Sequence, residues 1–159
     1  MKLKQFVQPA LAILFGSISC LSLASCSGGG GGGDNSPSAW DIVINNPTNG
    51  FIMKAVYPSD NVMETYTCRP DGTCDIEFSD GPGKTAGLPY TLTKIDDTHA
   101  VFIDSQEMKG AKAEDVFEIT YNPSTRQSKA KWTETYTPET GSPQKDTEDN
   151  IAITFELLP

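Results

Sequence analysis

Residues 150–158 read Asn-Ile-Ala-Ile-Thr-Phe-Glu-Leu-Leu, and large apolar side chains occupy every second position of this stretch. The apolar positions are Ile151, Ile153, Phe155 and Leu157, and Thr154 and Glu156 lie between them. Successive side chains of a β-strand point to opposite faces, so the alternation predicts a strand with one face in a core and the other in water. Such strands are typical of antiparallel sheets.

The same alternation recurs upstream, where Cys74, Ile76 and Phe78 are separated by acidic residues. Clusters of Pro, Gly, Asn and Asp divide the chain into segments rich in β-branched and aromatic residues, which favour strands. The predicted strands are 40–45, 50–57, 62–69, 73–79, 88–95, 100–104, 115–121, 129–137 and 150–158. We therefore expect an all-β domain, either a single antiparallel β-sandwich or a small up-and-down barrel, of about 8 to 9 strands.

Four segments depart from simple alternation. Residues 51–57 and 100–103 carry apolar residues at both phases, so we expect central strands that are covered on both sides. The one helix that we expect is a short turn around 105–113. Residues 146–150, Asp-Thr-Glu-Asp-Asn, form the densest acidic stretch, but they lack the spacing and glycine of a calcium loop, so we expect a solvated loop.

The first 25 residues have the layout of a secretory signal. Lys2 and Lys4 precede an apolar run at 10–15, and no acidic residue occurs before Cys26. That run is shorter than the ~20 apolar residues that a transmembrane helix needs. Six glycines at 28–33 follow, and this composition predicts a flexible linker.

Leu23-Ala24-Ser25-Cys26 resembles the lipobox of bacterial lipoproteins. The resemblance implies cleavage before Cys26, a diacylglyceryl group on its thiol and an acylated amino terminus, which together make a stable lipid anchor. The domains would be a signal peptide at 1–25, a lipidated cysteine with a Gly-rich linker at 26–39, and an all-β domain at 40–159. Because Ser27 follows the cysteine, the implied location is the bacterial cell envelope, at the outer membrane, on its periplasmic face or the cell surface.

Two alternatives to this assignment stay open. Cys20 is a competing lipidation site, although Ser17 stands where the family has Leu, and an ordinary secretory signal could end after a small residue.

A second resemblance, to the strand units of small secreted β-meander proteins, is carried by Tyr90–Lys94, Ala100–Phe102 and Phe117–Tyr121 together. This second similarity supports the fold class and implies no activity.

Cys68 and Cys74 are left after Cys20 leaves with the signal and Cys26 takes lipid. They flank residues 69–73, Arg-Pro-Asp-Gly-Thr, whose composition predicts a hairpin loop with a glycine bulge. If the loop forms, Cys68 faces Cys74, and we expect a disulfide in an oxidising compartment. Zinc is the alternative, but two cysteines and one distant histidine do not supply four ligands. We expect no metal and no cofactor.

The chain carries 12 basic and 21 acidic residues, and removal of the two signal lysines leaves 10 minus 21, or a net charge of −11. So acidic a surface argues against a nucleic-acid partner. His99 is the single histidine and follows a turn sequence, and no G-x-S-x-G motif occurs, so we expect no catalytic triad.

Four residues are the remaining site candidates. Glu64 and Glu134 share the alternation phase of Tyr66 and Trp132, which predicts that both carboxylates point inward. The alternative is that both lie near strand ends and reach solvent. Trp132 is expected in the core, and Tyr136, near a strand end, is the best placed aromatic residue for an exposed binding role.

These observations favour a non-catalytic, membrane-anchored binding or structural module rather than an enzyme. Its partner would be a glycan, a peptide or another envelope protein, held by loops or by an exposed strand edge. One alternative is a small hydrolase that uses the inward carboxylates. Another is a small barrel that carries an apolar ligand.

Overall fold

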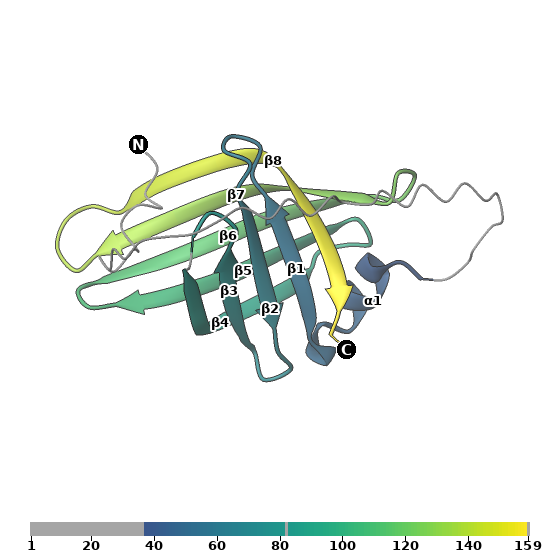
Figure 1. Cartoon of the computed structure of the whole chain (residues 1–159), viewed down its shortest axis with the longest axis horizontal. Coiled ribbons are helices and arrows are strands. Elements are labelled where there is room, and N and C mark those ends of the chain that lie inside the picture. Colours follow the sequence, from purple (N-terminus) through teal and green to yellow (C-terminus); the bar gives the residue numbers. More distant parts are fainter. Residues whose placement is uncertain (1–36, 82, 159) are drawn as a thin grey trace, which may run out of the picture.

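The computed structural model describes residues 37–81 and 83–158, so the predicted signal, lipobox, Cys26 and glycine-rich segment lie outside the described residues. Eight antiparallel strands form one closed up-and-down barrel (Figure 1). The strands are β1 Phe51–Val56, β2 Met63–Cys68, β3 Thr73–Phe78, β4 Lys84–Lys94, β5 His99–Met108, β6 Ala111–Asn122, β7 Gln127–Pro138 and β8 Gln144–Leu157. The all-β prediction is confirmed, and of the two architectures expected the barrel is the one observed.

Pairing between the first and last strands closes the barrel. β1 runs antiparallel to β8, with Phe51 opposite Leu157 and Val56 opposite Ala152. Every other strand pairs with its neighbours in sequence, which gives the simplest meander order. A barrel of eight strands has an interior just wide enough for side chains or one small ligand.

The predicted strand at 40–45 is wrong, because Ala39–Asn45 form the helix α1. A capping box starts this helix: the Ser38 hydroxyl accepts from the Asp41 N–H at 3.2 Å, and the Asp41 carboxylate accepts from the Ser38 N–H at 3.0 Å. The buried residues Trp40, Val43 and Ile44 have the i, i+3, i+4 spacing of a helix face. The local cap and this spacing outweigh the β-branched composition that suggested a strand.

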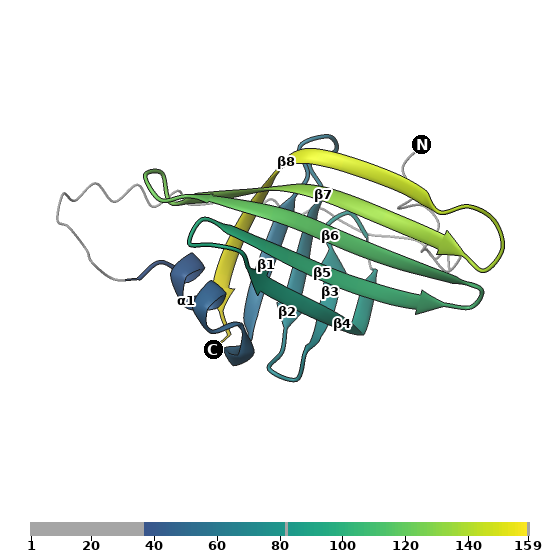
Figure 2. The same cartoon turned by 180° about the vertical axis from the view of Figure 1, so that it is seen from behind.

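The helix α1 covers one end of the barrel (Figure 2). The Trp40 ring stacks on Tyr121 with ring centroids 5.1 Å apart, and its indole N–H donates to the Asp97 carbonyl at 3.0 Å. A short 3₁₀ helix, Pro47–Asn49, then leads into β1. Within the described ranges, none of the helices has the length and apolarity to cross a membrane.

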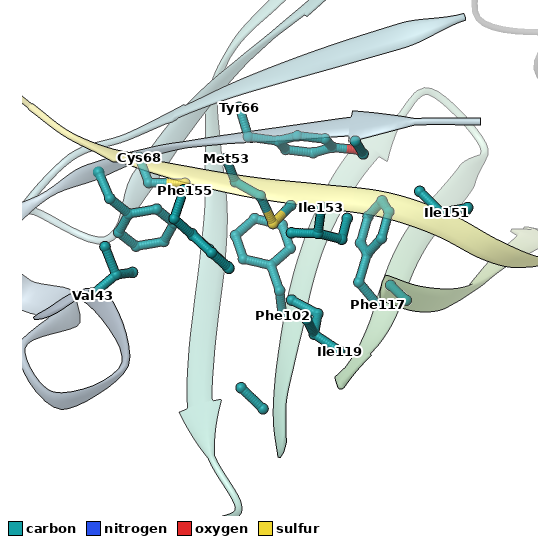
Figure 3. Packing of buried hydrophobic residues seen from close by; sticks show 14 of the residues in the cluster. Val43, Met53, Tyr66, Cys68, Phe102, Phe117, Ile119, Ile151, Ile153 and Phe155 are labelled. Carbon is teal, nitrogen blue, oxygen red and sulfur yellow. The ribbon is translucent and has the colours of Figure 1, made fainter. Parts of the chain in front are cut away.

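Large side chains fill the barrel between α1 and its middle (Figure 3). Met53, Phe102 and Phe117 are completely buried there, and aromatic pairs such as Phe102 and Phe117, with centroids 6.0 Å apart, link neighbouring strands. Figure 3 shows the Tyr66 ring along the same interior with its hydroxyl directed away from Val43 of α1. The interior is therefore apolar at the α1 end and becomes polar farther along the strands.

Two further predictions are corrected by the strands. The turn expected at 105–113 is instead a tight hairpin, since β5 continues to Met108 and pairs there with Ala111 of β6. Gly110, with φ +81°, makes that turn. The acidic stretch 146–150 lies within β8 instead of in a loop, because it pairs with β7 from Gln144 onward.

The segments 51–57 and 100–103 are not covered on both sides. Their second apolar set, which includes Ile52 and Val101, lies on the outer face of the barrel and is half-buried. A closed barrel has one inside and one outside, so no strand of the described barrel occupies the central position that we expected.

The strands β5 to β8 extend beyond β1 to β4 at the end opposite α1 (Figures 1 and 2). The β4–β5 ladder stops at Tyr90 and Asp104, whereas the β5–β6 ladder continues to Met108 and Ala111. Likewise, β8 pairs with β1 only from Ala152 onward but with β7 from Gln144 onward. This half-sheet forms one tall wall of the open end.

Candidate acidic pocket

Three carboxylates form a row inside the open end of the barrel. Asp104 of β5 lies directly opposite Asp115 of β6, and Asp115 lies directly opposite Glu134 of β7. Side chains directly opposite on adjacent strands have Cβ atoms about 4.5–5.5 Å apart, and like charges in such pairs destabilise a sheet. Each carboxylate is two residues from a buried ring on its own strand, which places the row on the inner face.

A fourth carboxylate, Glu64 of β2, completes the cluster from the opposite wall. It is 3% exposed and lines the same cavity as the row. The cavity measures about 70 Å³. The other lining residues are mainly apolar or aromatic: Tyr66, Ile76, Phe78, Leu88, Ala113 and Trp132, with Thr85 and Gln106. We call this cavity the acidic pocket.

Two tyrosines hold Glu64. The hydroxyls of Tyr57 and Tyr66 both donate to Oε2 of Glu64, at 2.6 Å and 2.7 Å. Burial raises the pKa of both hydroxyls well above the usual value, and the charge of Glu64 raises it further. Both tyrosines therefore stay protonated and act as donors, which fixes the carboxylate in one position.

Asp115 has a donor of its own in Trp132. The indole N–H donates to Oδ1 of Asp115 at 2.7 Å. The Trp132 ring also packs edge-on against Tyr57, with centroids 5.5 Å apart. The supports of Glu64 and of Asp115 are thus in contact, and together they make a rigid polar wall.

Asp104 differs from its neighbours because one of its oxygens is unsatisfied. The side chain is 2% exposed, and among the described atoms its Oδ2 has no hydrogen-bond partner. Burial raises the pKa of Asp104 well above its ordinary value, and the nearby charges of Asp115, Glu64 and Glu134 add to the effect. A buried carboxylate oxygen without a donor is costly, and native proteins seldom leave one without a purpose.

The acidic pocket does not have the arrangement of a metal site. In the part of the chain that the structure describes, no three His, Cys, Asp or Glu side chains are placed to hold one metal ion. Calcium requires six to eight oxygen ligands at about 2.3–2.6 Å, all converging on one point. The carboxylates here surround a cavity instead.

The structure shows where the side chains singled out in the sequence lie, and it adds two carboxylates to them. Glu64 and Glu134 point inward, as their phase predicted, and Trp132 is buried at 2% exposure. Tyr136 is half-buried two residues beyond Glu134, on the inner face, and not on an exposed surface. Asp104 and Asp115 were not predicted as site residues, because each is the terminal residue of a predicted strand. Each is nevertheless two residues from a phenylalanine, Phe102 or Phe117, and this spacing predicts that the carboxylate shares the face of that ring.

Cys68 and Cys74 lie directly opposite each other across the β2–β3 hairpin. The predicted glycine bulge is present, with Gly72 at φ +83° and its N–H donating to the Arg69 carbonyl at 3.2 Å. Both cysteines are free thiols in this structure and are completely buried. Burial, and the contact with Cys74, raise the pKa of the Cys68 thiol far above its usual value.

Two other polar features lie away from the acidic pocket. His99 lies in the β4–β5 turn near α1, where its Nδ1 is 2.9 Å from the Asp96 carboxylate, so it is remote from the acidic pocket along β5. A larger hollow of about 400 Å³ lies between the start of α1 and nearby residues of β7 and β8, bordered by Ser38 and Arg126. It adjoins the first described residues of the chain.

The fold and the pocket define a class: a small closed antiparallel barrel, capped by a helix at one end and lined with carboxylates at the other. No protein-family model matches the chain, and no curated protein or solved structure matches it. The acidic pocket is therefore the feature of the molecule from which a function can be inferred.

Proposed function

We propose that this protein is a non-catalytic binding module of the bacterial envelope, tethered to the outer membrane through a lipid on Cys26, and that its barrel takes a small ligand in the acidic pocket. The observation that carries the proposal is the buried row Asp104, Asp115 and Glu134, with Glu64 opposite. Stability alone does not account for such a row, because like charges directly opposite each other oppose folding.

Like many ligand-binding sites, the acidic pocket has preorganised polar groups in an apolar cavity. Its carboxylates are held by donors on neighbouring strands, such as Tyr66 for Glu64 and Trp132 for Asp115, so they are in place before a ligand arrives. Rigid polar groups in an apolar cavity provide orientation and specificity at low entropic cost. Packed side chains fill the barrel between the pocket and α1, which leaves little room for a large apolar ligand.

The position of α1 suits a tether. The described chain enters at Ser38, beside Tyr121 and far from the pocket along the strands. An anchor on Cys26 would therefore attach, through the predicted flexible linker, at the covered end of the barrel, opposite the acidic opening. Attachment at that end leaves the acidic opening free to turn away from anionic lipid head groups, which repel carboxylates.

A hydrolase is the second candidate, because one observation favours it. The pKa of Asp104 is raised beside carboxylates that accept hydrogen bonds, and a protonated acid next to an ionised base is the arrangement that general acid–base catalysis uses. A cavity of about 70 Å³ admits only part of a glycan or a peptide, however. Loss of a measured hydrolytic activity in Glu64→Gln and Glu134→Gln would favour this candidate.

We also propose that Cys68 and Cys74 form a disulfide in the exported protein. Their register in the hairpin supports this, because directly opposite residues bring Cβ atoms within the range that a disulfide needs. The closed ring is short, so the chain-entropy contribution would be modest. The bond would fix the β2–β3 hairpin at the α1 end of β2, the strand that carries Glu64.

The experiment that tests the proposed function uses the full chain expressed in a bacterial host. Wild-type and Cys26→Ser proteins are labelled with radioactive palmitate, and the label should be found only in the wild type. Protease added to intact cells then distinguishes the cell surface from the periplasmic face. Native mass spectrometry of wild-type protein extracted in mild detergent should show a small bound molecule. Palmitate on Cys26→Ser would refute the tether, and a wild type that is always empty would refute the binding function.

A further inference from the structure

We infer that the ligand of the acidic pocket is a small organic cation, which places an ammonium group beside Asp104 and its short apolar part against the aromatic wall. This inference rests on the proposed binding function and adds the chemical class of the ligand. It depends on four features of the pocket: its charge, the unsatisfied oxygen of Asp104, its size, and its apolar lining.

The charge of the pocket selects a cation. Asp115 lies directly opposite Asp104 on one side and Glu134 on the other, and Glu64 lines the same cavity. An anion would meet repulsion from all sides, and a neutral ligand would leave the repulsion within the row unrelieved. A bound positive charge relieves the repulsion and favours loss of the Asp104 proton, so the same charges that oppose folding of the empty barrel favour a cationic ligand.

Asp104 requires a hydrogen-bond donor. Its Oδ2 is buried and has no partner among the described atoms, while Glu64 and Asp115 already accept from Tyr66 and Trp132. An ammonium group carries three donors and no acceptor, so it can satisfy Asp104 and still reach a second carboxylate. Hydrogen bonds between charged partners are also stronger than those between neutral ones.

The size and lining of the pocket select a short organic ammonium. A cavity of about 70 Å³ accommodates an ammonium head with a few carbon atoms, but not a sugar ring with its substituents or a peptide segment. Trp132 and Phe78 line it together with Leu88. Aromatic faces attract cations, and apolar walls favour alkyl carbon over a hydrated metal ion.

A metal ion fits the described geometry less well than an organic cation does. No three candidate ligands among the described side chains converge on one position. The firmly held carboxylate of Glu64 would also have to leave its two tyrosine donors, Tyr57 and Tyr66, to join a common coordination sphere. The organic cation requires neither rearrangement.

Isothermal titration calorimetry of the full-chain protein in non-ionic detergent tests the inference. The probes are n-butylammonium chloride, butan-1-ol, sodium butyrate and calcium chloride at constant ionic strength. We expect saturable binding of n-butylammonium alone. Asp104→Asn should weaken this binding at least about tenfold, since a charged hydrogen bond is lost. Glu134→Gln tests the same row if Asp104→Asn fails to fold, as judged by circular dichroism.

Glu118→Gln is the matched control, because Glu118 is exposed on the outer face of β6, the strand that carries Asp115. It removes the same charge and should change n-butylammonium binding less than twofold. If butan-1-ol binds as tightly as n-butylammonium and Asp104→Asn has no effect, the cationic class is overturned while the binding function stands. Binding of calcium alone also overturns it. If no probe binds and the wild type is always empty, the inference and the proposed function both fail.

Discussion

Replacing Asp104 with asparagine should stabilise the barrel at neutral pH. In the folded protein, burial first and the charges of nearby groups second raise the pKa of Asp104 well above its ordinary value of about 3.9. The groups that face it are Asp115 of β6, Glu64 of β2, Glu134 of β7 and the thiol of Cys74 on β3. The unfolded chain imposes none of these environments, so the ionised form is disfavoured only in the folded state.

The sign follows from proton linkage. Below about pH 4, Asp104 is protonated in the folded and the unfolded chain, and its effect on stability is constant. As the pH rises from there toward the raised pKa, the unfolded chain loses its proton first, so the folded state binds more protons and the free energy of unfolding falls. The carboxyl thus destabilises the empty barrel most at neutral pH, and asparagine removes this loss.

The magnitude is that of a buried carboxylate oxygen that ionises without a donor, whereas the Asn side chain is neutral and brings two N–H donors to the row. A buried polar atom without a partner costs about 1–3 kcal/mol. For a domain of this size, 1 kcal/mol moves Tm by about 4 °C. Asp104→Asn should therefore raise Tm by about 4–12 °C at pH 7, and the difference should shrink toward zero near pH 4.

Differential scanning calorimetry between pH 4 and pH 8 checks this prediction, with sodium as the only added cation and with Glu118→Gln as a control. The control changes an exposed carboxylate and should shift the free energy of unfolding by less than about 0.5 kcal/mol. An unchanged or lowered Tm of Asp104→Asn at pH 7, with the pH dependence of the wild type retained, would refute the reasoning. That result would mean that Asp104 is ionised and satisfied in the folded protein.

Three further predictions concern other parts of the barrel. Tyr66→Phe removes one of the two donors to Glu64 and should lower the free energy of unfolding, measured by urea denaturation, by about 1–3 kcal/mol. The control Tyr136→Phe changes a half-buried tyrosine and should have little effect, so equal losses in the two variants would contradict the role assigned to Tyr66. Ser38→Ala removes the cap of α1 and should lower the free energy of unfolding by about 1 kcal/mol, while Ser38→Asp, which keeps a capping oxygen, should lower it less. If thermal melting shows no loss of stability in either variant, α1 does not contribute to stability. In full-chain protein with Cys20→Ser and Cys26→Ser, Cys68 and Cys74 should take up two alkyl groups, measured by intact mass, only after denaturation together with reduction. Alkylation of the denatured protein without reductant would exclude the disulfide.

Alternation predicted the strands wherever one face is apolar, as in β3 and β8. It failed where a strand leaves the apolar core: the first part of β8, from Gln144, and the last part of β5, to Met108, line the polar opening and resemble loops in sequence. The helix α1 was missed for another reason. Its Ile42-Val43-Ile44 run has strand propensity, and the decisive signal was the cap formed by Ser38 and Asp41.

Two of the four carboxylates that line the acidic pocket were predicted to point inward. Glu64 and Glu134 were placed inward because each shares its phase with an aromatic residue on the same strand. The direct opposition of Asp104 and Asp115 depends on the register of the β5–β6 hairpin, which the turn at Gly110 sets. Sequence periodicity specifies the face of a strand but not its partner, so the row became visible only with the register.

The ladder between β1 and β8 also determines when the barrel can form. Phe51 and Leu157 pair although most of the chain separates them, and such closure is slow because loop entropy is lost before any contact is gained. Until β8 has been synthesised, β1 has only β2 beside it, and the apolar inner faces of both have no enclosing wall. The last strand is thus the step that closes the barrel, and a growing chain stays open until β8 has been added.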